Sequence, residues 1–225
     1  MDKSRTPLDK WAAAIDLLGS TNGANAKQLS AAIGVSHKTA WTMLKKFRNA
    51  IHRLEAERKL SGTVHAGLRA LAPKSIFTFL PHRHYRCERV VGVVASVDAY
   101  DAPRELAIHV VPSGSLRLGW KELTNEGKEQ LSSNAASSGS TVVWLNDFRM
   151  DHSPLDECFR EANAWLLRLF HGIGSAYLQS YLAEFCFRWN AAARGDDLRE
   201  AWYKLCYHRP SRKSIGDHLE MRAAA

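Results

Sequence analysis

Three apolar segments in the middle of the chain, rich in β-branched residues, constrain its fold most strongly. They lie at residues 89–98 (RVVGVVASVD), 104–111 (RELAIHVV) and 140–145 (STVVWL), with turn residues between the first two. The first two therefore predict a β-hairpin and the third a short strand. Residues 8–60, and those from about 156 onward, have the spacing of amphipathic helices. Strands between two helical stretches predict an α/β or α+β domain behind a helical region.

Length and charge limit the function classes that need to be considered. The chain has 225 residues, which is enough for one medium core and a small accessory domain, and its net charge of +8 favours a polyanionic partner. We divide it into a helical N-terminal region (1–60), a second domain (61–208) and a polar tail (209–225). Its four cysteines are too far apart for a paired-thiolate metal motif, so we expect reduced thiols. No apolar run reaches membrane-spanning length, and we expect no membrane partner.

The N-terminal region has the pattern of a helix-turn-helix. Residues 27–33 predict a short helix, Gly34 suits the turn, and Ser36 is a favourable N-cap for a second helix that continues to about residue 60. In such motifs the second helix meets base edges, while lysine and arginine hold phosphates. The outward positions of the second helix are Ser36, His37, Lys38, Thr42, Lys45 and Lys46, and we expect these residues together with Arg48 to bind DNA. The alternative is a basic helix that faces solvent in a small bundle.

Two stretches together resemble bacterial insertion-sequence transposases of the ISXO-type group. Residues 8–51 contain a tryptophan-bearing helix, then the helix-turn-helix with Lys-Thr-Ala-Trp at 38–41. Residues 162–190 are similar to the closing segment of that family, with Trp165, then His-Gly at 171–172. The likeness covers most of residues 7–190 and is densest at both ends.

This resemblance implies an RNase H-like mixed sheet with flanking helices and a two-metal site of acidic residues. Mg²⁺ or Mn²⁺ would be the cofactor of an active member, because hard cations prefer carboxylate oxygens and paired ions stabilise both oxygens of a phosphoryl displacement. Asp147 matches the second acid of the family, and Glu161 matches the third polar position. Gly67 and Leu68 stand where the first acid should be. Asp98, at the end of the first hairpin strand, is a weaker candidate to replace it.

We therefore expect a transposase-derived protein that binds double-stranded DNA and has lost catalysis, with no cofactor and with Asp147 and Glu161 as vestiges of the metal site. One alternative is an active DNA-cutting and joining enzyme that uses Asp98 or Asp101 with Asp147 and Glu161. Another is a protein-interaction module on the same fold. Self-association is compatible with all three hypotheses. A bacterial cytoplasmic location, associated with the nucleoid, would follow from the first.

Overall fold

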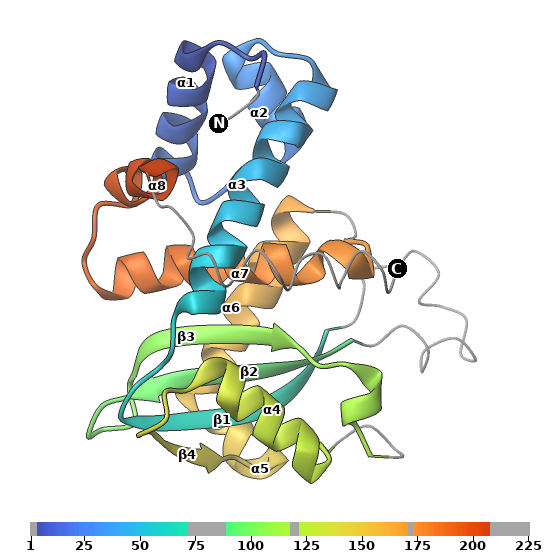
Figure 1. Cartoon of the computed structure of the whole chain (residues 1–225), viewed down its shortest axis with the longest axis vertical. Helices are drawn as coiled ribbons and strands as arrows, with labels where there is room; N and C mark the ends of the chain where they lie inside the picture. Colours follow the sequence, from blue (N-terminus) through green and yellow to red (C-terminus); the bar gives the residue numbers. More distant parts are fainter. Residues whose placement is uncertain (1–3, 72–88, 118–121, 171–172, 208–225) are drawn as a thin grey trace. The chain divides into compact units, whose positions relative to one another are not determined.

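The computed structural model describes residues 4–71, 89–117, 122–170 and 173–207 (Figure 1). The chain divides into two compact units. We call Met1–Glu57 with Asp197–Ala225 the helical unit, and Arg58–Asp196 the sheet unit. The HRHYR stretch at 82–86, Cys87 and the polar tail at 209–225 lie outside the described residues.

The helical unit contains α1 (Leu8–Ser20), α2 (Ala26–Ile33), α3 (His37–Glu57) and α8 (Leu198–Tyr207). Local chemistry sets the ends of α2. Asn25 and Gln28 form a reciprocal capping box at its start, and Gly34 ends it in the left-handed conformation with φ +66°. A residue with a Cβ adopts that conformation at a cost, so glycine suits this turn. The Ser36 hydroxyl accepts the Thr39 N–H at 3.1 Å, which confirms Ser36 as the cap of α3.

An aromatic cluster holds the helical unit together. The Phe47 ring on α3 lies edge-on to Trp11 of α1 at 5.2 Å and to Trp202 of α8 at 5.4 Å between centroids. Edge-to-face pairs of this kind add to the free energy gained by burying the rings. The sequence division at residues 61–208 is therefore wrong for α8. Its buried face, which includes Trp202 and Leu205, belongs to the helical unit.

The sheet unit is built on four strands in the order β3-β2-β1-β4. They are β1 (Thr63–Leu71), β2 (Arg89–Val97), β3 (Pro103–Val110) and β4 (Thr141–Trp144). The first three are successively antiparallel, whereas β4 runs parallel to β1. The mixed α/β class predicted from the sequence is confirmed, and this sheet is consistent with an RNase H-like core.

Helices cover both faces of the sheet (Figure 1). Side chains alternate along β2, as the pleat of a strand requires. Val91 and Val93 pack in a cluster with α6 (Pro154–Leu169) and α7 (Ser175–Ala193). Val90 and Val94 pack in a second cluster, which contains Leu131 of α4 (Asn125–Ala135). Two short helices, η3 (Ser113–Ser115) and α5 (Asp147–Asp151), complete the unit.

The segment before α4 differs from what its apolar spacing predicts. That spacing indicates a helix over residues 115–131, but the helix begins only at Asn125, where the Thr124 side chain accepts the Gly127 N–H. Leu116 instead forms an antiparallel bridge with Leu123. Apolar spacing alone could not separate these two outcomes. Within the described residues, no helix is long and apolar enough to cross a membrane.

Candidate nucleic-acid interface and acidic pocket

The turn between α2 and α3 is fixed by several hydrogen bonds. The Gly34 and Val35 N–H groups both reach the Ser30 carbonyl, at 3.0 and 3.3 Å, and the Ser30 hydroxyl donates to the Val35 carbonyl at 2.7 Å. Lys10 of α1 donates its Nζ to the Ile33 carbonyl at 2.7 Å, at the negative end of the α2 dipole. The three helices are thus tied at one point, and α3 leaves the turn in a defined direction.

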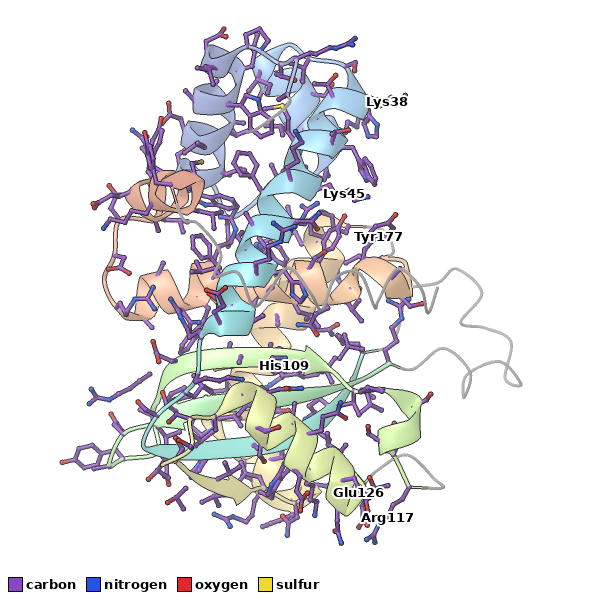
Figure 2. The ribbon with its side chains drawn as sticks, in the orientation of Figure 1. Lys38, Lys45, His109, Arg117, Glu126 and Tyr177 are labelled. Carbon is purple, nitrogen blue, oxygen red and sulfur yellow. The ribbon has the colours of Figure 1, made fainter. Side chains whose placement is uncertain are left out.

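Most of the predicted outward residues of α3 are exposed. Ser36, His37, Lys38, Thr42 and Lys45 are exposed and Lys46 is half-buried; Figure 2 shows Lys38 and Lys45 on this helix. The prediction for Arg48 is wrong, because only 4% of its surface is exposed. Position 48 follows Leu44 by four residues and precedes Ile51 by three, so it shares their buried face.

Some of the exposed side chains of α3 form hydrogen bonds within the helix itself. The Ser36 hydroxyl bonds the Thr39 hydroxyl at 2.8 Å besides capping the helix, and the Thr42 hydroxyl donates to the Lys38 carbonyl at 2.9 Å. The Lys45 Nζ lies 5.1 Å from the ring centre of Trp41, which is 40% exposed. The exposed side of α3 therefore carries cations and an aromatic ring, groups that suit phosphates and bases.

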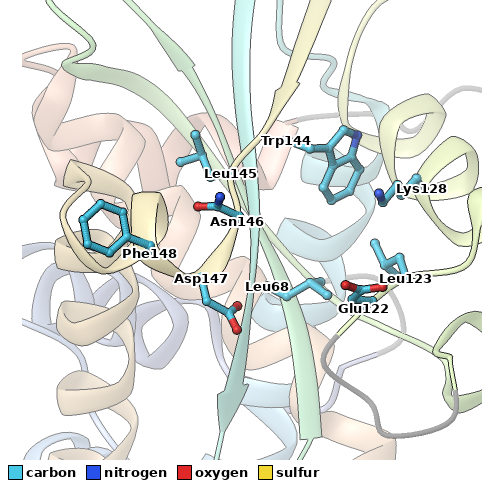
Figure 3. Close-up of a pocket in the computed structure, with 9 residues that line it drawn as sticks. All are labelled: Leu68, Glu122, Leu123, Lys128, Trp144, Leu145, Asn146, Asp147 and Phe148. Atoms are coloured by element: carbon cyan, nitrogen blue, oxygen red, sulfur yellow. The ribbon is translucent and has the colours of Figure 1, made fainter.

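In the sheet unit, Asp147 lies near Gly67 and Leu68 of β1, the positions at which the resemblance implies a first acid. Val64 to Ala66 of β1 pair in parallel with Val142 to Trp144 of β4, and the Leu145 N–H donates to the Ala66 carbonyl at 2.7 Å. Asp147 follows at once, in the first turn of α5. It shares an open pocket with a second acid that the sequence analysis did not single out, Glu122 (Figure 3). The remaining lining residues are Leu68, Leu123, Lys128, Trp144, Leu145, Asn146 and Phe148.

Leu68 occupies the part of this pocket where a first carboxylate would be expected. In the view of Figure 3 its side chain lies between the carboxylates of Asp147 and Glu122. Leu68 also packs against the apolar cluster beneath α4. Position 67 could not carry the carboxylate in place of position 68, because a Cβ on Gly67 would lie 2.5 Å from the Met150 sulfur. The strand β1 therefore presents an apolar side chain to the pocket at position 68. Position 67 has no space for a carboxylate side chain.

The hypothesis that Asp98 replaces the missing acid is wrong. Ser96 of β2 pairs with Val64, so the antiparallel register places Asp98 opposite position 62, whereas the parallel register places Asn146 opposite position 68. At about 3.3 Å per residue, these places are roughly 20 Å apart along β1. Asp101 lies in the same hairpin turn, where its carboxylate is 3.6 Å from the His65 ring of β1, and it does not line the pocket of Asp147.

Asp98 has a structural role in that hairpin. Its carboxylate accepts the Tyr100 and Ala102 N–H groups at 2.8 and 3.1 Å. These two backbone hydrogen bonds, aided by nearby Arg104, hold the pKa of Asp98 below its ordinary value of 3.8. A carboxylate in this arrangement closes the turn between β2 and β3.

Glu161 does not join Asp147 in the pocket. It is exposed on α6 and is not among the lining residues. Among the residues that the structure describes, no group of three histidine, cysteine or acidic side chains is placed to hold a metal ion. The sequence analysis missed Glu122 because apolar spacing predicts a helix over that segment, and the Leu116–Leu123 bridge instead brings it to the pocket.

Comparisons with known proteins assign this chain to no family. No description of a known protein family matches the chain, and no curated protein matches it. One solved structure to which it is similar is described as the crystal structure of a pre-cleavage Mos1 transpososome. The two chains are 12% identical, with a TM-score of 0.23 over 91% of this chain and 80% of that one. A likeness at this level carries no argument about fold or function.

Proposed function

We propose that this protein binds double-stranded DNA through α3 of a helix-turn-helix and carries an RNase H-like unit that no longer cleaves DNA. It would be a transposase-derived DNA-binding protein. The observation that carries the proposal is the fixed turn at Gly34, followed by a helix whose exposed side holds His37, Lys38, Thr42 and Lys45.

The electrostatics of α3 favour a nucleic acid over an uncharged partner. The chain carries 31 Lys plus Arg against 23 Asp plus Glu. From His37 to Ala50 no residue of α3 is acidic, whereas three are lysines and one is an arginine. A phosphate backbone supplies the complementary charge, and binding gains free energy from the release of its counterions.

The loss of catalysis rests on the composition of the acidic pocket. Two divalent ions bring four positive charges, which carboxylates must balance and position. Asp147 and Glu122 are the acids that line the pocket, with the apolar Leu68 in its wall. None of Asp98, Asp101 and Glu161 lines the pocket. Mg²⁺ or Mn²⁺ would bind here only weakly.

Fluorescence anisotropy with labelled duplex DNA tests the binding proposal. The full chain is compared with a Lys38→Gln, Lys45→Gln double variant at several salt concentrations. We expect weaker binding, with the slope of log K against log salt reduced by about one for each phosphate that the variant no longer neutralises.

A matched control removes two lysines elsewhere in the helical unit, as Lys27→Gln with Lys204→Gln. This variant has the same net charge as the first but leaves α3 intact. Equal decreases of affinity in the two double variants would contradict a specific role for α3. If the affinity of the wild type did not depend on salt concentration, DNA binding through phosphates would be contradicted.

A further inference from the structure

A second basic feature of the helical unit lies between α3 and the segment that precedes α1. A hollow of about 270 Å³ is lined there by nine residues. They are Ser4, Arg5, Thr6, Trp11, Lys38, Thr39, Thr42, Met43 and Lys46. Since each water takes about 30 Å³ in the liquid, a phosphate group with several waters would fit.

The lining of this hollow is cationic on two sides. Arg5 comes from the N-terminal segment, whereas Lys38 and Lys46 come from α3. Among the residues that the structure describes, no aspartate or glutamate lines it and no ion pair joins Arg5 or Lys38 to a carboxylate. Three positively charged side chains that line one hollow create a potential that attracts an anion.

The stem of Lys46 is held in place at this hollow. Its Nζ lies 5.8 Å from the ring centre of the buried Trp11, which is itself part of the lining. A half-buried lysine fixed over an aromatic ring loses less side-chain entropy on binding than a free surface lysine does. Lys46 is therefore better suited to one bound phosphate than to a variable base edge.

The outward residues of α3 form two stripes along the helix, of which one lines the hollow and the other does not. Positions 38, 42 and 46 are four residues apart and all line the hollow. Positions 37, 41 and 45 form the neighbouring stripe, and none of them lines it. The second stripe is thus left for the bases or the groove, while the first faces the N-terminal segment.

We infer that Arg5, Lys38 and Lys46 form a pocket that binds one phosphate group of a nucleic-acid backbone, and that Arg5 extends the DNA contact beyond the helix-turn-helix. The inference rests on the proposed DNA binding. A guanidinium binds a phosphate through two parallel N–H donors, so Arg5 is the group that gives the pocket its geometry.

Anisotropy titrations of the full chain on two duplexes of unrelated sequence test the pocket. Arg5→Gln should weaken binding to both duplexes by the same factor and lower the salt slope by about 0.9, the share of a single phosphate. Arg5→Lys should restore the slope but only part of the affinity. Arg53→Gln, at an exposed arginine of α3 outside the hollow, should bind both duplexes more tightly than Arg5→Gln does.

A second arm measures inorganic phosphate by isothermal titration at constant ionic strength. If the wild type binds phosphate at millimolar concentration and Arg5→Gln abolishes this binding, the pocket is supported and also takes free phosphate. If Arg5→Gln weakens only the binding of DNA, a backbone phosphate is supported as the occupant. Arg5→Gln that matches the wild type in both arms overturns the inference and leaves the proposed function standing. A wild type that binds phosphate but not DNA overturns the proposed function and, with it, the backbone phosphate.

Discussion

At the scale of single residues, the side chains that β1 contributes determine the chemistry of the acidic pocket. Leu68 is apolar beside Asp147 and Glu122, and Gly67 has no room for a side chain. The resemblance placed the missing acid at these two positions, and the parallel pairing of β1 with β4 explains why: the carboxylate after β4 lies next to them. For Arg48 two sequence signals conflict: its spacing from Leu44 and Ile51 favours the buried face, whereas its charge favours the surface, where most arginines lie.

A carboxylate at position 68 should create a metal site. In Leu68→Asp, three acids would converge in the pocket, and we expect affinity for Mn²⁺ to rise by at least about tenfold, which corresponds to roughly 1.4 kcal/mol. Electron paramagnetic resonance of free Mn²⁺ measures this directly. Leu68→Asn is the control, because it loses the same packing without adding charge. Identical Mn²⁺ binding by the two variants would show that the pocket is not a former metal site.

Arg69 should be a main determinant of the stability of the sheet unit. It donates to Asp156 and to Asp151, each at 2.6 Å, and its side chain is 13% exposed. Arg69→Ala would leave the partly buried Asp156 with one fewer partner, and we expect a loss of about 2 kcal/mol in the free energy of unfolding by urea. The comparison is Arg104→Ala, whose side chain is 71% exposed in its pair with Asp98. It should cost less than about 1 kcal/mol.

At the scale of elements, local chemistry was the most predictable part of the fold. The turn at Gly34, the cap at Ser36 and the β2–β3 hairpin follow from residues close together in the sequence. The helix α8 was predicted, but its place in the helical unit was not, and neither was the pairing of Leu116 with Leu123. The Leu116–Leu123 bridge and the contact of Trp202 with Phe47 are decided by packing, which hydrophobic spacing does not specify.

Gly34→Ala should weaken the helix-turn-helix through the backbone alone. Its φ is +66°, and the nearest atom that an added Cβ would meet is the Lys10 Nζ, at 3.8 Å. Space is therefore not limiting, and the left-handed conformation should cost about 1 kcal/mol of unfolding free energy. Gly114→Ala, where nothing lies within 4 Å and φ is not in that region, should change stability far less. Equal effects of the two substitutions would contradict a strained turn.

The β2–β3 hairpin should loosen in acid. Because the folded-state pKa of Asp98 is held below its ordinary value of 3.8, the carboxylate stabilises the fold above that value. This contribution is lost as the pH falls through the lower folded-state pKa. An NMR titration should place the Asp98 pKa below 3.8, with faster amide exchange at Tyr100 and Ala102 once it is protonated. An unshifted Asp98 pKa would contradict the two hydrogen bonds.

At the scale of the whole molecule, two units divide the proposed tasks. The helical unit carries the proposed DNA-binding surface, and the sheet unit carries a four-stranded mixed sheet with the acidic pocket that we propose to be catalytically inactive. The sequence predicted this division except for α8, which returns from the end of the chain to the first unit. Asp147 follows β4 and lines the pocket, and its role as a former metal ligand stays a prediction. It could not exclude Asp98, because strand register decides which end of a sheet a residue occupies, and register is a long-range property.

The most direct test of the proposed function is incubation of supercoiled plasmid with the full chain in Mn²⁺, followed by gel electrophoresis with and without removal of the protein. We predict that the plasmid is retarded at low salt but remains supercoiled after the protein is removed. Nicking by the wild type that Asp147→Ala abolishes would contradict the central claim, because it would show that the pocket still assembles a working metal site without a first acid on β1.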